Sequence, residues 1–206
     1  MSGHFITFEG GDGSGKTTQI ELLATWLTER GHTVCVTREP GGTDLGRQLR
    51  DIILHSTDFI SPRSEALLYA ADRAHHIKTL VRPALERDEV VVQDRYLDSS
   101  VAYQGAGRVL DPAEVEHLSM WAVEGLLPDL TVLLDVPADV AKHRQAQTER
   151  SFDRLEAEDL EFHERVRESY LERAKAFPDR FLVVDGTMPI DEIHQVIAQR
   201  VSELVG

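Results

Sequence analysis

The chain has 206 residues, of which 22 are Lys or Arg and 36 are Asp or Glu, so its formal net charge is −14. This excess of acids excludes a broad basic face for nucleic acid, because neutralising phosphates requires clustered Lys and Arg. With 41% hydrophobic and 28% charged residues, the composition is that of a soluble globular protein and excludes intrinsic disorder and low-complexity repeats.

Neither a membrane span nor a signal peptide is expected. There is no run of about 18 apolar residues, and the N-terminal segment lacks a basic start and a long apolar stretch. The single cysteine, Cys35, excludes an internal disulfide and is expected to be a small buried side chain. These features predict a cytoplasmic protein that binds neither membranes nor nucleic acid.

The apolar pattern predicts strands and helices that alternate along the chain. Strands are expected at 4–9, 33–37, 89–94, 130–136 and 181–184. Helices are expected at 16–30, 44–54, 62–86 with a break at Pro83, from 111 onward, at 137–144, in the charged segment ending near 175, and at 189–204. Several strands are continuous apolar runs, which is typical of a parallel sheet covered on both faces. We therefore expect one doubly wound α/β domain over 1–206, with a polar lid at about 145–154.

A glycine-rich turn between the first strand and the first helix has the spacing of a phosphate-binding loop. Residues 10–17 match G-x-x-x-x-G-K-[ST] in the strand–turn–helix context that this motif requires. Backbone N–H groups of such a loop cradle a triphosphate, Lys16 reaches its β- and γ-phosphates, and the Thr17 hydroxyl binds Mg²⁺. The loop residues expected to bind ATP are Gly10, Gly11, Asp12, Gly13, Ser14, Gly15, Lys16, Thr17 and Thr18.

The loop alone does not say what the triphosphate is used for, since GTPases, motors, transporter ATPases and small kinases all contain it. No N-K-x-D sequence is present, so guanine recognition of the GTPase kind is unsupported. Asp94 ends the third expected strand and is followed by Arg95 rather than by a second acid. This departs from the pattern of hydrolytic motors.

Four segments, FEGGDGSGKTTQ, TREPGGT, QDRYLDSSVAYQG and FDRLE, resemble those of thymidylate kinases (dTMP kinases), from about residue 4 to residue 190. The resemblance implies a P-loop nucleoside-monophosphate kinase with a five-stranded parallel sheet, and a homodimer. It implies transfer of the γ-phosphoryl group of ATP, with Mg²⁺, to dTMP, giving dTDP and ADP for dTTP synthesis. Two alternatives stay open: a kinase for another monophosphate, and a P-loop ATP-binding module without phosphoryl transfer.

The chemistry of such an acceptor calls for arginine. A phosphate with a second pKa of about 6 is already nucleophilic, so it needs charge neutralisation and in-line positioning rather than a general base. Arg95 lies where ligands bind in open α/β sheets, and the resemblance assigns it to the dTMP phosphate. Asp94 is expected to hold Mg²⁺ through water or to orient Arg95, and a purely structural Asp94–Arg95 ion pair is the alternative.

Tyr69 and Arg73 are spaced i, i+4 and share a helix face. The resemblance implies that Tyr69 stacks on thymine and that Arg73 donates to its O4 atom; the alternative is a core aromatic residue and a surface arginine. By the same resemblance, Ser100 binds the base edge, Tyr103 excludes a 2′-hydroxyl and Asp12 accepts from the 3′-hydroxyl. The residues expected to bind dTMP are Asp12, Pro40, Arg50, Tyr69, Arg73, Arg95, Ser99, Ser100, Tyr103 and Gln104.

A catalytic cation is expected in the lid, because positions 11–14 of the loop contain no basic residue and the resemblance places this residue in one segment or the other. The candidates are Lys142, Arg144, Arg150 and Arg154. The resemblance implies that Arg144 stacks on adenine. Arg150 is expected to contact the transferred phosphoryl group beside Lys16 and Arg95, and Arg154 is the alternative for this role.

Overall fold

The computed structural model describes residues 3–108, 110–147 and 154–206. The strands of this part of the chain form one parallel sheet in the order β2-β3-β1-β4-β5. The chain thus builds outward from β1 to one side and then to the other, which is the doubly wound α/β fold expected from the sequence. The strands are β1 (Phe5–Glu9), β2 (Val34–Arg38), β3 (Val90–Asp94), β4 (Leu130–Asp135) and β5 (Phe181–Asp185).

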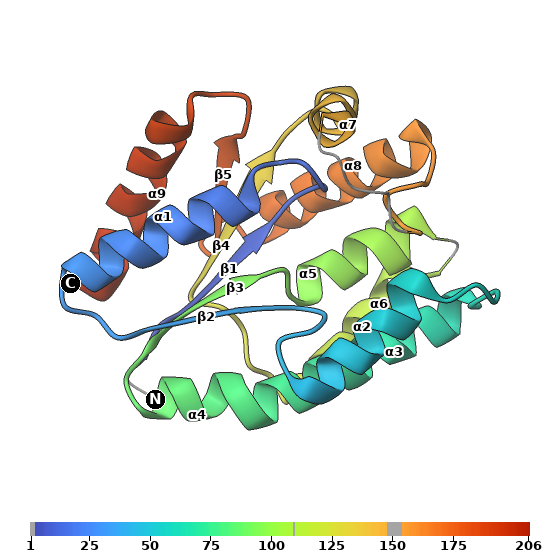
Figure 1. Cartoon of the computed structure of the whole chain (residues 1–206), viewed down its shortest axis with the longest axis horizontal. Coiled ribbons are helices and arrows are strands. Elements are labelled where there is room, and N and C mark those ends of the chain that lie inside the picture. Colours follow the sequence, from blue (N-terminus) through green and yellow to red (C-terminus); the bar gives the residue numbers. More distant parts are fainter. Residues whose placement is uncertain (1–2, 109, 148–153) are drawn as a thin grey trace.

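Helices connect the strands and cover both faces of the sheet (Figure 1). The α-helices are α1 (Lys16–Glu29), α2 (Asp44–His55), α3 (Pro62–His76), α4 (Arg82–Glu86), α5 (Leu97–Ser100), α6 (Pro112–Ala122), α7 (Ala138–Ala146), α8 (Leu160–Ala176) and α9 (Ile190–Val205). Two π-helical segments, η1 (Ile77–Val81) and η2 (Val101–Gly107), continue α3 and α5. The start of α6 is capped as its sequence indicates, because the Asp111 carboxylate accepts from Ala113 N at 2.9 Å.

Successive side chains of each central strand point to opposite faces. On β1, Ile6 and Phe8 pack against α1 and α9, whereas Phe5 packs against η1 and α4 on the other face. Figure 1 shows α1 and α9 on one side of the sheet and α3, α4 and α6 on the other. All of β1 is buried, which explains its continuous apolar sequence.

The break expected at Pro83 is present, but it lies N-terminal to the proline. Residues 62–86 form α3, the π-helical turn η1 and then α4, with Pro83 in the first turn of α4. A proline there has no N–H to donate, and its ring crowds the carbonyl four residues earlier, so the preceding turn widens. No helix was expected over 97–107, where α5 and η2 lie.

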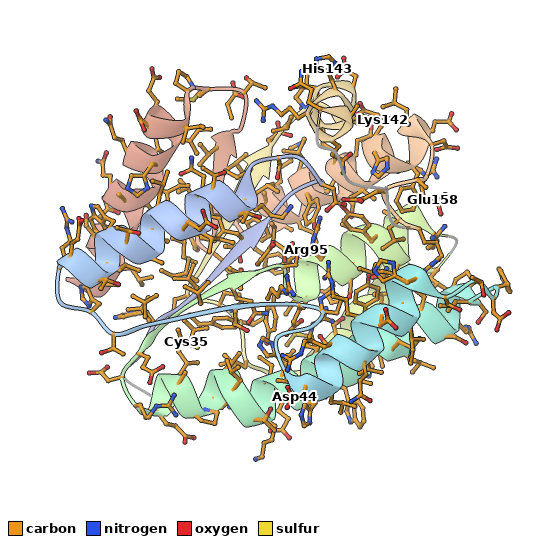
Figure 2. The ribbon with its side chains drawn as sticks, in the orientation of Figure 1. Cys35, Asp44, Arg95, Lys142, His143 and Glu158 are labelled. Carbon is orange, nitrogen blue, oxygen red and sulfur yellow. The ribbon has the colours of Figure 1, made fainter. Side chains whose placement is uncertain are left out.

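Cys35 is half-buried rather than buried, contrary to the expectation from its apolar neighbours. It lies on β2, an edge strand of the sheet, where a side chain is covered less completely than at the centre. The next residue, Val36, is 53% exposed for the same reason. Figure 2 marks Cys35 away from the carboxyl edge of the sheet, where Arg95 lies. An apolar run of three residues, 34–36, therefore does not distinguish an edge strand from a central one.

The carboxyl ends of β1, β3 and β4 meet at one edge of the sheet, and each of these strands ends in an acidic residue: Glu9, Asp94 and Asp135. This is the edge at which ligands bind in open α/β sheets. In the described part of the chain, no helix combines the length and apolar character needed to cross a lipid bilayer.

Candidate active site

The loop between β1 and α1 wraps around the side chain of its own lysine. Gly10, Gly13 and Gly15 have φ values of 134°, 80° and 96°, which strongly favour glycine. A Cβ on Gly13 would also lie 2.6 Å from Ala141 O. Lys16 Nζ donates to Gly10 O at 3.1 Å and to Gly11 O at 2.9 Å. Burial and the neighbouring Arg95 lower the pKa of Lys16. This geometry can accept a phosphate at the helix N-terminus.

A second part of the loop borders a separate cavity. This cavity is lined by Gly13, Gly15 and Thr18 on one side and by Arg144 and the segment after β5 on the other. Arg144 Nη1 donates to Gly186 O at 3.0 Å, which fixes the guanidinium at the cavity wall. Arg144 and Thr18, both expected on the ATP side, are thus brought to the same cavity as the loop.

Two residues expected to hold magnesium also share a cavity. Thr17, in the first turn of α1, and Asp94, at the end of β3, both line it. Asp94 Oδ1 is buried and has no hydrogen-bond partner among the described residues. An unpaired buried carboxylate oxygen beside a hydroxyl fits a hydrated Mg²⁺ ion, which usually keeps several waters and binds few protein ligands directly. The described residues contain no group of three or more His, Cys, Asp or Glu that could hold a metal.

All ten residues expected to bind dTMP line one pocket between the phosphate-binding loop, α3 and the segment after β3. Arg95 is one of them, with a φ of 64° that turns the chain away from β3. Its Nη2 contacts Asp12 Oδ1 at 2.6 Å and Tyr103 OH at 3.2 Å. Its Nη1 contacts Ser99 Oγ and Tyr170 OH, each at 3.2 Å. Arg95 therefore pairs with Asp12 and not with Asp94, so the structural ion pair considered as an alternative is wrong.

Charge fixes the protonation states of this group. Burial disfavours the Asp12 carboxylate, but Arg95 and Lys16 outweigh it and hold the pKa of Asp12 below its usual range. Burial raises the pKa of Tyr103, so its hydroxyl stays protonated and donates to Asp12 Oδ2 at 3.0 Å. The Tyr103 ring packs edge-on against Phe162 and Tyr170. It is a fixed wall of the pocket.

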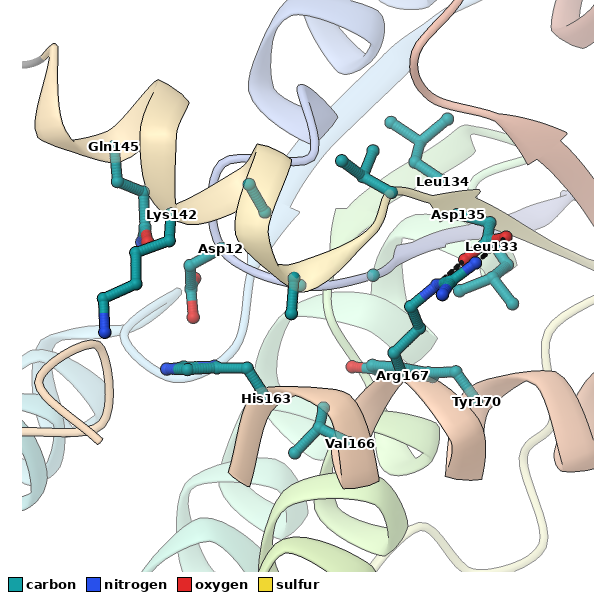
Figure 3. A pocket seen from close by; sticks show the side chains of 15 residues that line it. Asp12, Leu133, Leu134, Asp135, Lys142, Gln145, His163, Val166, Arg167 and Tyr170 are labelled. Atoms are coloured by element: carbon teal, nitrogen blue, oxygen red, sulfur yellow. Dashed lines mark hydrogen bonds and ion pairs between the residues drawn. The ribbon is translucent and has the colours of Figure 1, made fainter. Parts of the chain in front are cut away.

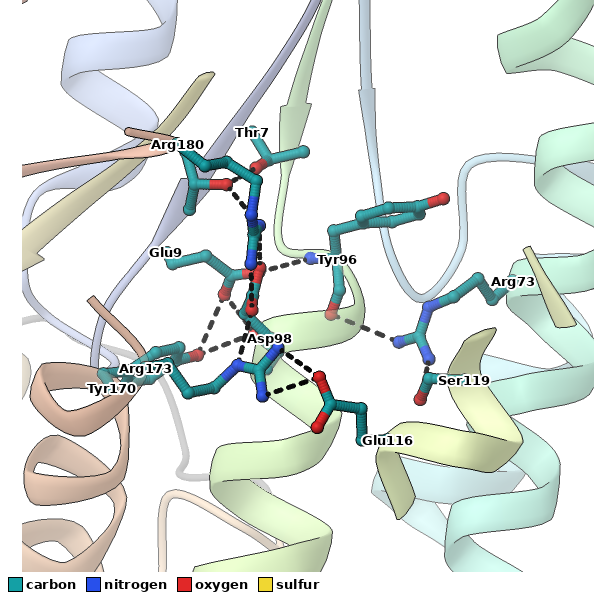
Figure 4. Close-up of polar contacts among 12 residues, drawn as sticks. Thr7, Glu9, Arg73, Tyr96, Asp98, Glu116, Ser119, Tyr170, Arg173 and Arg180 are labelled. Carbon is teal, nitrogen blue, oxygen red and sulfur yellow. Dashed lines mark hydrogen bonds and ion pairs between the residues drawn. The ribbon is translucent and has the colours of Figure 1, made fainter. Parts of the chain in front are cut away.

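Arg73 is fully buried, contrary to the alternative of a surface arginine. Its Nε donates to Glu39 Oε2 at 2.8 Å, and its Nη2 donates to Tyr96 O and Ser100 Oγ. Its Nη1 donates to Ser119 Oγ at 3.2 Å (Figure 4). A guanidinium has five N–H groups, so one hydrogen on Nη1 remains without a partner among the described residues. A pyrimidine carbonyl can accept that hydrogen.

The other expected residues complete the pocket wall. Tyr69 is half-buried and packs partly against the apolar cluster that contains Tyr103. Arg50 Nη1 donates to Pro40 O at 3.0 Å, which joins α2 to the loop after β2. Gln104 Nε2 donates to the buried Glu65 at 2.9 Å. These contacts hold the pocket in shape.

Sequence reasoning missed four further residues that line the same pocket: Glu39, Leu54, Tyr96 and Leu155. Glu39 is buried and accepts from Arg73 and from His76 Nδ1 at 2.9 Å. Arg73 and His76 are spaced i, i+3 on α3, and this pair of basic residues was the available signal for a buried acid opposite them. Leu54 and Leu155 are apolar residues whose role depends on tertiary contacts alone.

The lid arginines have different positions. Arg150 lies outside the described residues. Arg154 forms an ion pair with the buried Glu65, and its Nε donates to Ile53 O at 3.2 Å. These two contacts hold Arg154 against α2 and α3. Lys142 lies on α7 and lines another cavity, where it faces Asp12 and His163 (Figure 3).

A buried ionic cluster centres on Asp98 of α5 (Figure 4). The Asp98 carboxylate, which has no exposed surface, accepts from Arg173 Nε at 2.6 Å and from Arg180 Nη1 at 2.6 Å. Arg173 also contacts Glu116 at 3.2 Å. The cluster ties α5 to α8 and to the start of β5. It thereby fixes α8, the helix that carries Tyr170, against the helix that carries Ser99.

Comparison with known proteins identifies the family. The family model for thymidylate kinase matches residues 8–197. A thymidylate kinase from Clavibacter sepedonicus is 62% identical over 205 residues, covering 100% of this chain and 97% of the relative. One from Leifsonia xyli subsp. xyli is 64% identical over 191 residues, covering 93% of this chain and 90% of the relative.

A solved structure supports the same assignment. The crystal structure of thymidylate kinase from Ehrlichia chaffeensis superposes with a TM-score of 0.80 and 32% sequence identity, over 98% of this chain and 99% of that one. The similarity therefore covers nearly the whole of both chains. With the family model and the relatives above, the conclusion is that this chain belongs to the thymidylate kinase family.

Proposed function

We propose that this chain transfers the γ-phosphoryl group of ATP to dTMP, giving dTDP and ADP for dTTP synthesis. The family match supports this reaction. The single structural observation that supports it most is the pocket in which ten predicted acceptor residues meet the phosphate-binding loop at Asp12. A kinase needs its donor and acceptor phosphates at adjoining sites, and Asp12 belongs to the loop and to the pocket.

On the donor side, Lys16 leaves the carbonyls of Gly10 and Gly11 and binds the β- and γ-phosphates, with the loop N–H groups around them. Thr17 and Asp94 would hold Mg²⁺, and this is supported by Asp94 Oδ1, which has no hydrogen-bond partner in the described part of the chain. When bound, the ion neutralises charge on the β- and γ-phosphates. Arg144 stacks on adenine at the edge of its cavity.

On the acceptor side, Arg95 neutralises the dTMP phosphate and holds it in line with the donor. No general base is required, because the dianion is itself the nucleophile. The fixed Tyr103 ring leaves no room for a 2′-hydroxyl, and Asp12 accepts from the 3′-hydroxyl. Thymine stacks on Tyr69, with its edge at Ser100 and its O4 atom at the remaining Arg73 hydrogen.

We further propose that residues 1–206 form a single catalytic domain with a lid at about 145–154, and that Arg150 contacts the transferred phosphoryl group. This assignment rests on the lack of another basic residue in the phosphate-binding loop and on the anchoring of Arg154 to Glu65. Charge on the three equatorial oxygens is what such a cation stabilises.

We also propose that the protein acts as a cytoplasmic homodimer. Large apolar side chains are exposed on three helices that pack in succession, α2, α3 and α6. Trp121 of α6 is 77% exposed, and Leu67 and Ile52 are also exposed. A second copy would remove this surface from water. Light scattering across a concentration series tests the dimer, and a monomer at all concentrations contradicts it.

The reaction is tested by coupled ADP release with ATP, Mg²⁺ and a panel of dTMP, dUMP, UMP, CMP and AMP. We expect the highest kcat/KM with dTMP. Lys16→Met, which removes the donor-side cation, is the matched inactive control. A maximum with another monophosphate would show that Tyr69, Arg73, Ser100 and Tyr103 are wrongly assigned. Nucleotide binding without turnover would contradict phosphoryl transfer itself.

A further inference from the structure

Glu9, at the end of β1, is a fully buried carboxylate to which the proposed reaction gives no role. Three donors converge on it (Figure 4). Its Oε1 accepts from Tyr96 N at 2.8 Å, and its Oε2 accepts from Ser99 Oγ at 2.5 Å and from Tyr170 OH at 2.9 Å. These donors come from the segment after β3 and from α8, so Glu9 joins three parts of the chain.

The same two hydroxyls also contact Arg95. Ser99 Oγ and Tyr170 OH each lie 3.2 Å from Arg95 Nη1, on the side of the guanidinium opposite Asp12 and Tyr103. A hydroxyl has one hydrogen to donate and two lone pairs to accept with. When both hydrogens point to Glu9, both oxygens present lone pairs to Arg95.

Without the carboxylate, a competing arrangement is available. Ser99 Oγ and Tyr170 OH lie 2.7 Å apart, so one can donate to the other. The hydroxyl that receives this bond then has fewer lone pairs for Arg95, and the donor is free to rotate away from its present direction. Two accepting oxygens are what hold the Nη1 end of the guanidinium in one orientation.

We infer that Glu9 is a positioning residue, whose carboxylate orients the Ser99 and Tyr170 hydroxyls and through them holds Arg95 toward the acceptor phosphate. This inference rests on the proposed function, because it assumes that Arg95 binds that phosphate. Glu9 does not touch the substrate. Its effect is confined to the part of the ligand that Arg95 binds.

The energetics agree with this geometry. Burial and the nearby Asp98 raise the pKa of Glu9 to about 7, and the hydrogen bond from Ser99, the charge of Arg95 and the Tyr96 N–H act in the opposite direction. Of the two hydroxyls that Glu9 orients, that of Ser99 therefore lowers the pKa of the carboxyl and favours its ionised form. Burying a carboxylate costs free energy because the group loses its hydration, and the three hydrogen bonds to Glu9 offset that cost.

The experiment compares binding of dTMP and thymidine, which differ only in the phosphate, by calorimetry on the full chain. In Glu9→Gln, whose side chain has the same size, we expect the dissociation constant for dTMP to rise about tenfold, the typical effect of one charge-assisted contact. Thymidine affinity should stay unchanged. Loss of affinity for both ligands by the same factor, or for neither, would overturn the inference.

A matched control comes from the same strand. Thr7 is fully buried, and its hydroxyl bonds to Thr131 Oγ1 at 3.0 Å, away from Arg95. Thr7→Val should leave the ratio of the two dissociation constants as in the unmodified protein. An equal change of that ratio in Thr7→Val would show that any buried polar substitution on β1 disturbs the pocket, and would overturn the inference.

Coupling between variants tests the route through the hydroxyls. In a Tyr170→Phe background one of the two links is already removed, so Glu9→Gln should weaken dTMP binding by a smaller factor than in the unmodified protein. Full additivity contradicts the route. If Glu9→Gln fails to fold, Glu9→Asp serves in its place, since it keeps the charge but draws the oxygens back from both hydroxyls.

The two proposals fail in different ways. If the unmodified protein binds neither dTMP nor thymidine while still binding ATP, the proposed function is wrong. If it binds dTMP more tightly than thymidine and Glu9→Gln leaves that preference intact, the role of Glu9 alone is wrong.

Discussion

Arg95 and Asp12 form an ion pair of 2.6 Å between Nη2 and Oδ1, which joins the end of β3 to the phosphate-binding loop. The pair joins the phosphate-binding loop to the pocket proposed for dTMP. Asp12 belongs to both, and Arg95 lines the pocket. Because Lys16 also stabilises the Asp12 carboxylate, three charged groups share this small region.

Asp12→Ala should raise the KM for dTMP by about tenfold and change the KM for ATP much less, since a hydrogen bond to a charged group contributes about 1.5–3 kcal/mol. The 3′-deoxy analogue of dTMP provides the control substrate. It lacks the hydroxyl that Asp12 is proposed to accept from, so Asp12→Ala should affect it far less. Equal effects on dTMP and the analogue would show that Asp12 acts only through its ion pair with Arg95 and does not bind the 3′-hydroxyl.

Arg73→Ala should weaken thymine recognition and also destabilise the fold. Arg73 and Glu39 are each 2% exposed, and removing one partner of a buried ion pair typically costs about 3–5 kcal/mol. We expect a higher KM for dTMP, an unchanged KM for ATP and a lower melting temperature. Arg63→Ala on the same helix is the control, because Arg63 is 77% exposed and its pairing with Glu114 contributes less than about 1 kcal/mol. An unchanged KM for dTMP in Arg73→Ala would refute the pocket assignment.

Short apolar runs separated by turns that contain glycine were sufficient to predict the sheet. Strands that are buried on both faces have a strong sequence signature. The phosphate-binding loop was predictable for a similar reason: positive φ at Gly13 and Gly15 limits the residues that fit. The half-burial of Cys35 was not predictable, since it depends on which strand lies at the edge.

Side-chain pairings between residues far apart in the chain could not be predicted from the sequence either. The residues expected to bind dTMP were named through resemblance, but the hydrogen-bond acceptors that hold Arg73 come from three separate segments. Its partner Ser119 lies 46 positions along the chain, and nothing in the local pattern of α6 marks it. The π-helical segment η2 was missed because its apolar residues are too few to define a period.

The lid arginines should separate in kinetics and stability. Arg150→Ala is expected to lower kcat with a smaller effect on either KM, because a transition-state contact is lost. Arg154→Ala should instead lower the melting temperature, because the buried Glu65 of α3 loses an ion-pair partner. Steady-state kinetics and thermal unfolding of both variants check this. A fall in kcat for Arg154→Ala equal to that for Arg150→Ala would transfer the catalytic role to Arg154.

The free energy of unfolding should depend on pH through Asp72, whose carboxyl contacts the loop that contains Pro40. Asp72 Oδ1 accepts from Gly41 N at 3.4 Å, and Oδ2 is buried without a partner among the described residues. Burial and the nearby Glu39 raise the pKa of Asp72 from 3.8 to about 6, against the opposing effects of His76, Gly41 N and Arg73.

The sign follows from proton binding. Between pH 3.8 and pH 6 the folded state holds the Asp72 proton and the unfolded state has lost it, so stability falls as pH rises through this window. Asp72→Asn cannot ionise. Relative to the unmodified protein it should therefore gain up to about 3 kcal/mol between pH 4 and pH 7, since one pKa unit corresponds to about 1.4 kcal/mol. Urea unfolding at both pH values measures the gain, with the exposed Asp51→Asn on α2 as the control for losing one negative charge. Parallel stability curves for Asp72→Asn and the unmodified protein would show that Asp72 is ionised in the folded state at pH 4.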